Sequence, residues 1–254
     1  MSAVTVQPLD DGALWHVRLA TPKANILDRE KLGLLSQCFV RAAAAPDLKA
    51  IVLDSDGPHF SFGASVVEHL PAHYDSMLRA FHGLFDRMLE SSVVTLAVVR
   101  GQCLGGGLEL ASFAHRVFAD PGAMLGQPEI VLGVFAPVAS VALVERVGRS
   151  RAEDLCLSGR SIDAGEAWRI GLVDVIDHDP LAAALAYARE HLFPRSASSL
   201  RFAARALRSG MAERLDHELA AVERMYRTEL MATHDANEGL TAFLEKRPPV
   251  WRNR

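Results

Sequence analysis

Apolar residues in the first half of the chain follow two alternating repeats, which together predict a layered fold. Short β-branched runs at 4–6, 14–19, 50–53 and 93–99 predict strands. The segments 28–44 and 77–89 instead carry apolar residues every three or four positions, the spacing of amphipathic helices. Asp28 is a suitable N-cap for the first helix, and Pro46 ends it. Strands alternating with helices predict an α/β architecture.

The pattern becomes helical after about residue 180, with helices expected at 182–192, 198–209, 213–232 and 236–246. We therefore predict a β/α core over 1–195 and a helical region over 196–254. An apolar stripe on the late helices favours packing against the chain's own core, with subunit contacts as the alternative; it comprises Leu215, Leu219, Val222 and Met225. A basic stripe, Arg201, Arg205 and Arg208, predicts a solvated face.

Composition narrows the class of protein. Of 254 residues, 50% are hydrophobic and 23% are charged, as in ordinary folded proteins, and the net charge of −4 gives no reason to expect nucleic acid or an anionic membrane as partner. Three separated cysteines indicate neither a disulfide framework nor a CxxC site. The N-terminus lacks the features of a signal peptide, and the longest apolar run is too short to cross a bilayer. Cytoplasm is the expected compartment.

A cluster of three glycines, Gly105 to Gly107, follows the predicted strand 93–99 and precedes a helical pattern. Each glycine costs a helix about 1 kcal/mol relative to alanine, so the cluster needs a compensating reason. Either backbone N–H groups approach a ligand closely here, or a strand and a helix cross tightly. The segment has neither GxGxxG nor a Lys-Ser/Thr ending, which argues against a dinucleotide site or a P-loop.

Two glutamates and one loop are candidates for chemistry. Glu109 falls in the first helical turn after the glycines, where a carboxylate also interacts favourably with the helix dipole. Glu129 follows Pro128 in an apolar segment; such surroundings raise a carboxyl pKa and suit acid–base work, although a structural ion pair is the alternative. The loop 59–66 contains Gly63 and Ala64, small residues that leave backbone N–H groups accessible to a ligand. The alternative is an ordinary buried loop without a role in binding.

In order and spacing, these segments resemble the crotonase (enoyl-CoA hydratase/isomerase) superfamily. The resemblance is carried by an FxxGA loop ending at Ala64, by GGGxE at 105–109 and by GQPE at 126–129. It extends over nearly the whole chain through 22–25, 158–160, 164–167, 171–174 and 238–247. The family resemblance implies a spiral of repeated ββα units with a C-terminal helical region that forms homotrimers or dimers of trimers.

The same resemblance implies roles for individual residues. The backbone N–H groups of Ala64 and Gly106 would form an oxyanion hole for the carbonyl oxygen of an acyl-CoA thioester, and Glu109 and Glu129 would flank a water and move protons. The family's substrate-contacting positions are matched by Lys23, Ala24, Ile26, Phe62, Ser65, Val66, Val67, Phe135, Phe243 and Lys246, the last two approaching from a neighbouring subunit.

Departures from the usual family pattern narrow the range of acyl groups that the pocket is expected to accept. Ser65 stands where hydratases of the family carry Asp, and 134–140 replaces a Gly-Ala-Gly-Gly run. Phe62 and Phe135 add aromatic side chains to the expected pocket. This combination resembles the branch of the family that hydrates cyclohexa-1,5-diene-1-carbonyl-CoA to 6-hydroxycyclohex-1-ene-1-carbonyl-CoA in anaerobic benzoyl-CoA degradation. It implies a hydro-lyase.

Other functions remain open from the residues alone. A hydratase for linear trans-2-enoyl-CoA and an enoyl-CoA isomerase use related sites, and a non-catalytic RNA-binding or scaffold protein belongs to a different class. The implied chemistry needs no cofactor, since coenzyme A is part of the substrate, and no metal. His69 and His73 have the spacing of zinc ligands on a helix, but Pro71 lies between them and no third ligand is evident.

Overall fold

The computed structural model describes residues 2–21 and 23–254. Its main sheet has the strand order β1-β2-β3-β4-β6-β9; only the β1–β2 pair is antiparallel. The strands are β1 (Val4–Leu9), β2 (Leu14–Leu19), β3 (Ala50–Ser55), β4 (Val94–Val99), β6 (Arg116–Ala119) and β9 (Val175–Ile176). A second sheet contains β5 (Gln102–Leu104), β7 (Met124–Gly126) and β8 (Ser161–Asp163), in the order β5-β7-β8.

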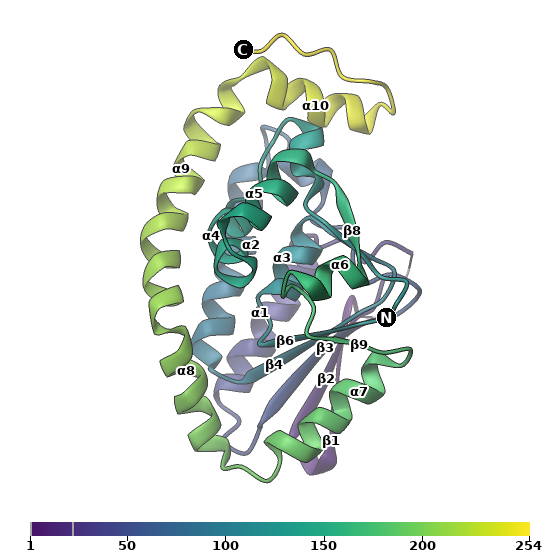
Figure 1. Ribbon diagram of the computed structural model, residues 1–254. Helices are drawn as coiled ribbons and strands as arrows, with labels where there is room; N and C mark the ends of the chain where they lie inside the picture. The colour runs from purple at the N-terminus through teal and green to yellow at the C-terminus, as the bar shows by residue number, and fades with distance from the viewer. Residues whose placement is uncertain (1, 22) are drawn as a thin grey trace.

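The helices cover the sheet on both sides (Figure 1). They are α1 (Arg29–Ala43), α2 (Tyr74–Ser91), α3 (Gly106–Ser112), α4 (Pro137–Val147), α5 (Arg149–Ser158), α6 (Ala164–Arg169), α7 (Pro180–Tyr187), α8 (Ala197–Arg214), α9 (Ala220–Thr228) and α10 (His234–Leu244). Two 3-10 turns matter for the site: η2 (Val66–His69) and η3 (Pro128–Leu132). The predicted N-cap is confirmed, because the Asp28 side chain accepts a hydrogen bond from Lys31 N at 2.9 Å.

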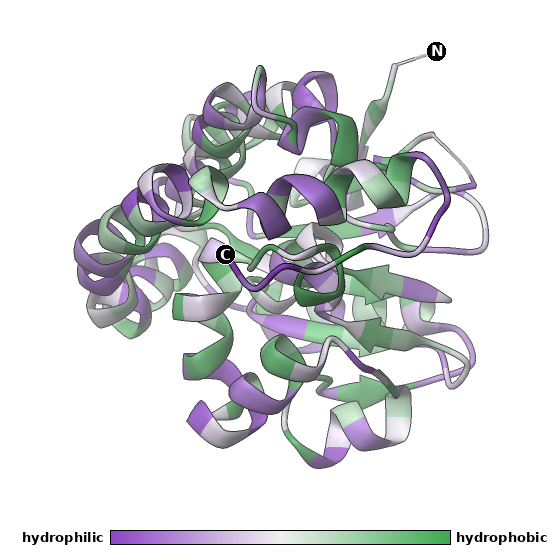
Figure 2. Ribbon diagram, turned by 90° about the horizontal axis from the view of Figure 1, so that it is seen from above, coloured by the Kyte–Doolittle hydropathy of each residue, from purple (hydrophilic) through white to green (hydrophobic). Residues whose placement is uncertain are grey.

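Alternation along the buried strands divides the core into two layers. Ile51 and Leu53 of β3 face α1 and α2, whereas Val52 faces α7 and contacts Ala184 and its neighbours there. Every residue of β3 is buried, as expected for a central parallel strand covered on both faces. Figure 2 shows the strands coloured mainly as hydrophobic between helices whose hydrophilic stretches face outward. The predicted α/β fold is confirmed.

The late helices continue the same core. A π-helical turn, Leu215–Leu219, joins α8 to α9, so that the two form one long curved rod along the molecule (Figure 1). Leu215 and Leu219 are buried in the main cluster, as the apolar stripe predicts, whereas Met225 is exposed. Within the described residues, we find no helix with both the length and the apolar character needed to span a membrane.

The basic stripe on α8 differs from its prediction. Arg201 donates hydrogen bonds to the carbonyl oxygens of Ser91, Ala42 and Ala45, at the C-terminal ends of α2 and α1. Arg208 donates to Phe113 O at 2.7 Å. Only Arg205 of the three is exposed. Arg201 and Arg208 thus cap helix ends, because the last carbonyl groups of a helix have no intrahelical partners and attract a cation.

Candidate active site

Two backbone N–H groups lie side by side where the loop after β3 meets the start of α3. Leu27 N donates to Gly63 O and Leu27 O accepts from Ser65 N, so the N–H of the intervening Ala64 points away from this pairing. Gly106 is the first residue of α3, where N–H groups have no intrahelical acceptor. A Cβ atom on Gly106 would lie only 3.1 Å from Ala64 N. The two predicted amide positions are therefore adjacent.

Each glycine of the cluster is required by a close neighbour. Gly105 has φ +53, and a Cβ there would overlap the Glu129 carboxyl group. A Cβ on Gly106 would press on the Phe81 ring at 3.0 Å, and one on Gly107 would meet Ser61 Cβ at 2.7 Å. The two interpretations left open by the sequence thus both apply: the glycines allow tight crossing, and they keep the amides uncovered.

Glu109 is the more enclosed of the two carboxyl groups. It is buried on α3, and its Oε1 accepts a hydrogen bond from Ala139 N, 2.7 Å away at the start of α4. Burial and the negative charge of Glu129 raise the pKa of Glu109, while this hydrogen bond acts in the opposite direction. The carboxyl group therefore keeps a proton to higher pH than an exposed glutamate.

Glu129 lies on η3, just after Pro128, and faces the glycine cluster. Burial raises its pKa, and its Oε2 is a buried atom without a hydrogen-bond partner among the described residues. The amide group of Gln127, which precedes it, is equally buried and unpartnered. Two acids with raised pKa values beside one cavity are suited to share and transfer a proton near neutral pH.

Two adjoining hollows connect these groups. The inner one is lined by both glutamates, Ala64, Gly106 and Phe135; the outer one shares Ala64 and Glu129 with it and opens past Phe62. Their free volumes are about 20 and 50 Å³, so the inner hollow holds about one water molecule. The four predicted catalytic positions, Glu109, Glu129, Ala64 and Gly106, thus surround one small cavity.

Aromatic residues lie at both ends of this path. Phe62 is exposed in the outer hollow, edge-on to His59 at 5.0 Å between ring centroids. Phe135 lies in the inner hollow, edge-on to Tyr226 at 5.3 Å. The two rings predicted to contact the substrate therefore lie in different hollows, because Phe62 belongs to the loop after β3 whereas Phe135 follows η3.

The segment expected to lie along coenzyme A is fixed by side chains that the sequence analysis did not single out. Asn25 donates to Asp56 O and His59 O, and its own carbonyl accepts from Ser61 Oγ. Lys31, buried on α1, donates to Ile26 O at 2.8 Å, and burial lowers its pKa to about 8. Ala24 O accepts from Phe62 N at 2.9 Å, which ties this segment directly to the amide loop.

The remaining predicted contacts lie around the entrance. Lys23 is exposed with φ +102, Val66 lines the outer hollow and Val67 is exposed beside it. Ser65 is half-buried, and its carbonyl oxygen accepts a hydrogen bond from His69 Nδ1 at 2.8 Å. Phe243 and Lys246 are exposed at the end of α10, which contacts η2 and η3 of its own chain, and neither lines the two hollows.

Two polar residues that the sequence did not single out, His82 and Tyr226, also line the cavity, as does His69, which its spacing made a candidate zinc ligand. Burial lowers the pKa of His69 and so favours its neutral ring. In the sequence, His82 and Tyr226 show only the spacing of residues on the buried face of a helix. That spacing does not distinguish core residues from site residues. In the described part of the chain, no three His, Cys, Asp or Glu side chains gather as metal ligands would.

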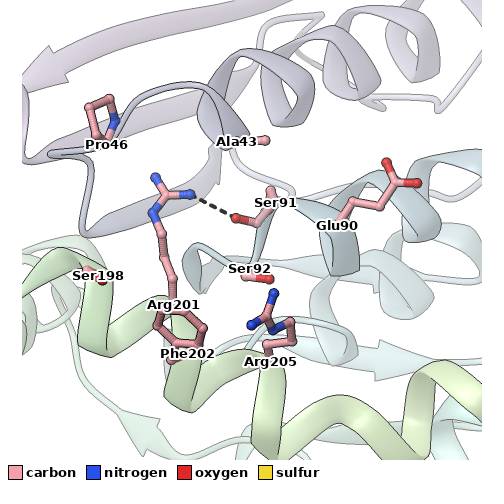
Figure 3. A pocket seen from close by; sticks show the side chains of 9 residues that line it. All are labelled: Ala43, Pro46, Glu90, Ser91, Ser92, Ser198, Arg201, Phe202 and Arg205. Atoms are coloured by element: carbon pink, nitrogen blue, oxygen red, sulfur yellow. Dashed lines mark hydrogen bonds between the residues drawn. The ribbon is translucent and has the colours of Figure 1, made fainter.

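A larger hollow lies elsewhere, between α8 and the ends of α1 and α2 (Figure 3). Its free volume is about 380 Å³, and Arg201, Phe202 and Arg205 form one wall. Arg201 is already engaged with backbone carbonyls there, as the dashed line to Ser91 illustrates. The groups that accept hydrogen bonds from Arg201 are carbonyl oxygens at helix C-termini, and no cluster of acid–base groups lines this hollow. The hollow therefore does not fit the acid–base chemistry of the smaller cavity.

Comparisons with known proteins agree with this geometry. Residues 10–254 match the family model described as enoyl-CoA hydratase/isomerase. The chain is 55% identical over 244 residues, 96% of this chain and 95% of the relative, to a cyclohexa-1,5-dienecarbonyl-CoA hydratase of Thauera aromatica. It is 32% identical, over the full length of both chains, to a probable enoyl-CoA hydratase of Mycobacterium bovis.

Solved structures show the same fold. The chain superimposes on an enoyl-CoA hydratase of Mycobacterium avium subsp. paratuberculosis with a TM-score of 0.86 at 23% identity, covering 99% of both chains. A carnitinyl-CoA hydratase of Mycobacterium avium gives a TM-score of 0.85 at 28% identity, covering 100% of both chains. Together with paired amides and carboxyl groups on one cavity, these matches show that the chain belongs to the enoyl-CoA hydratase/isomerase family.

Proposed function

We propose that this protein hydrates cyclohexa-1,5-diene-1-carbonyl-CoA to 6-hydroxycyclohex-1-ene-1-carbonyl-CoA. The observation that carries the proposal is the placement of Glu109, Glu129 and the amides of Ala64 and Gly106 around one cavity. The choice of acyl group is supported by the 55% identity to a hydratase named for this substrate. Phe62 and Phe135 provide flat apolar surface on the way to and inside the cavity.

The amides supply charge stabilisation where charge develops. When the oxygen of water bonds to ring carbon C2, the electrons of the C1=C2 double bond move toward the thioester oxygen and create an enolate. Hydrogen bonds from Ala64 N–H and Gly106 N–H hold this oxygen, and one such donor contributes about 3 to 4 kcal/mol to the transition state. The negative charge extends over the neighbouring C5=C6 double bond. A proton added to C5 leaves the new double bond between C1 and C6, which is the stated product after renumbering.

The paired glutamates supply the base. Both pKa values are raised by burial, and the charge of Glu129 raises that of Glu109 further, so losing both protons is costly. A pair that keeps one proton near neutral pH has one carboxylate available to accept the proton of water. Addition of water involves no oxidation or reduction, so we propose that no cofactor is needed.

The test compares turnover of the cyclic dienoyl-CoA with turnover of linear crotonyl-CoA. We expect kcat/KM to favour the cyclic substrate by about 100-fold, the upper range that pocket shape provides. Preference for crotonyl-CoA would identify a linear enoyl-CoA hydratase, and faster double-bond migration in a 3-enoyl-CoA would identify an isomerase.

Substitution of the two acids tests the catalytic roles. Glu109→Gln and Glu129→Gln should each lower kcat by about 10²- to 10⁴-fold, the contribution of a positioned acid–base group. Glu153→Gln, on the exposed surface of α5, is the matched control and should retain the wild-type rate. Wild-type turnover by both cavity variants would refute the assignment and leave room for a non-catalytic role.

The proposal also covers the oligomeric state of the protein and its cellular compartment. We propose a homotrimer or a dimer of trimers in the cytoplasm, acting on acyl-CoA without nucleic acid or membrane as partner. Large apolar side chains exposed on the late helices support self-association, among them Phe202, Leu207 and Met225. Light scattering at micromolar concentration should give at least three times the mass of one 27.6 kDa chain; a monomer would contradict it.

A further inference from the structure

The wall of the inner hollow formed by α2 and α9 carries polar atoms that have no partner. His82 is 6% exposed and Tyr226 is 1% exposed, and both line the hollow together with Glu109 and Glu129. Among the described residues, neither His82 Nε2 nor the Tyr226 hydroxyl makes a hydrogen bond, whereas His82 Nδ1 faces a carboxylate of α9. Leaving a buried polar group unpaired costs about 1 to 3 kcal/mol, so such atoms point to partners that arrive with a ligand.

Helix α9 reaches this wall with one turn. Tyr226 is the only buried residue of α9, and its ring is fixed edge-on against Phe135. Glu223, one turn earlier, places its Oε2 3.3 Å from Nδ1 of His82. A hydrogen bond from His82 lowers the pKa of Glu223, which is therefore a carboxylate near neutral pH. A carboxylate at this distance can accept a hydrogen bond from Nδ1–H and so hold the orientation of the imidazole ring.

Other charged groups surround this histidine. Asp86, on its own helix, faces it, and Arg79 and Arg227 flank Glu223. Across the hollow, the facing titratable groups are Glu109, Glu129 and His69. Glu223 also has a route to water, since its side chain is 19% exposed. Of these neighbours, Glu223 is the one whose carboxylate lies against the ring of His82.

Hydration of the cyclic substrate requires a proton donor at a second position, and the groups around His82 are placed to provide it. In a linear enoyl-CoA the proton goes to the carbon beside the thioester, but in the proposed reaction it goes to C5, across the ring from the carbon that receives oxygen. A single acid–base site beside the attacking water at C2 does not also reach C5. A second acid on a different wall of the hollow can deliver the proton to C5.

We propose that His82 is this second acid, with Glu223 and Tyr226 as positioning residues; the inference rests on the function proposed above. The oxygen of water bonds to C2 while its proton passes to the glutamate pair. Nε2–H of the protonated His82 ring gives its proton to C5, and the C5=C6 electron pair forms the new C–H bond. The proton on the glutamates is then released to solvent, and His82 regains one through Glu223, so that the net change is addition of one water.

The experiment uses the full-length protein and the cyclic dienoyl-CoA. His82→Gln should lower kcat by about 100-fold or more and leave KM within a few-fold, while circular dichroism remains that of the wild type. His73→Gln, at the exposed start of the same helix, should keep the wild-type rate.

A second variant separates chemistry from folding. Glu223→Gln removes the carboxylate that orients His82, so kcat should fall about tenfold or more while KM stays within a few-fold. Glu223→Asp keeps a carboxylate and should restore part of the lost kcat, a pattern that a packing defect alone does not produce. A His82→Gln or a Glu223→Gln enzyme with wild-type kcat overturns the inference. Absence of cyclic turnover in the wild type overturns the proposed function itself, and the inference with it.

Discussion

At the scale of single residues, Glu109 is subject to opposing effects. Burial and the neighbouring carboxylate favour its protonated form, whereas the Ala139 N–H at the start of α4 favours the ionised form. Burial is the larger effect, and the pKa is raised. The same balance that prepares the carboxyl group to exchange a proton also makes its ionised form unfavourable in the folded state.

A dependence of stability on pH follows. Above the ordinary glutamate pKa of about 4.3, the unfolded chain loses a proton that the folded protein keeps until its raised pKa is reached. The folded protein then binds more protons, so its stability decreases as pH rises through this window. Glu109→Gln removes the free-energy cost of ionising this buried carboxyl group in the folded protein. The Tm of the variant should match the wild type near pH 4 and exceed it increasingly toward pH 8, by ~2 to 4 °C per kcal/mol for a chain of this size.

Thermal unfolding at several pH values measures this difference. Glu153→Gln, on an exposed position, should follow the wild type at every pH. A Tm difference for Glu109→Gln that shrinks as pH rises would mean that the ionised carboxylate stabilises the fold, contrary to the sign of the pKa shift.

At the scale of elements, the junction between β5 and α3 sets the geometry of the site. Gly105 ends the extended segment with φ +53, donates its N–H to Gly126 O at 2.9 Å and leaves room for Glu129. The turn thereby places a carboxyl group from η3 against the first turn of α3. No side chain at position 105 is compatible with that contact.

Gly105→Ala should therefore lower both activity and stability. The methyl group displaces the Glu129 carboxyl group, and the left-handed backbone adds strain of about 1 to 3 kcal/mol; we expect kcat to fall at least tenfold. Gly83→Ala is the matched control, because a Cβ at this position in α2 meets nothing within 4 Å. It should keep the rate and gain up to about 1 kcal/mol of stability. Equal kcat values for the two variants would show that Glu129 tolerates the shift.

This junction is predictable from the sequence, whereas the residues that surround it are predictable only in part. Three glycines before a helix are locally costly, and that cost identifies Gly106 and Glu109 as special without any structure. His82 and Tyr226 carry no such signal, because a histidine or tyrosine on the apolar face of a helix has the same spacing as core residues. The packing of α2 against α9 brings His82 and Tyr226 together although they lie 144 positions apart in the sequence, and only tertiary contacts reveal this.

At the scale of the whole molecule, the late helices are fastened to the sheet core by arginines. Arg201 donates to carbonyl groups at the ends of both α1 and α2, and Arg208 donates to Phe113 O after α3. These contacts explain why Arg201 and Arg208 of the predicted solvated stripe are half-buried. They also fix the rod formed by α8 and α9, which carries Glu223 and Tyr226 to the cavity.

Arg201→Ala should lower the free energy of unfolding by about 1.5 to 3 kcal/mol, since hydrogen bonds from a charged group to several buried carbonyls are lost. Arg205→Ala, one turn along the helix and exposed, should change it by less than about 0.5 kcal/mol. Urea unfolding of both variants measures the difference. Comparable stability of the two variants would show that solvent replaces Arg201 at the helix ends.

The contribution of α9 to the inner hollow has a consequence for how such proteins diversify. A chimaera that keeps the sheet core of this chain and takes its tail from a relative would retain both amides and both glutamates, yet acquire a foreign wall at Tyr226 and Glu223. Exchange of the tail alone would then redirect which acyl groups are accepted, while the machinery that polarises the thioester stays untouched.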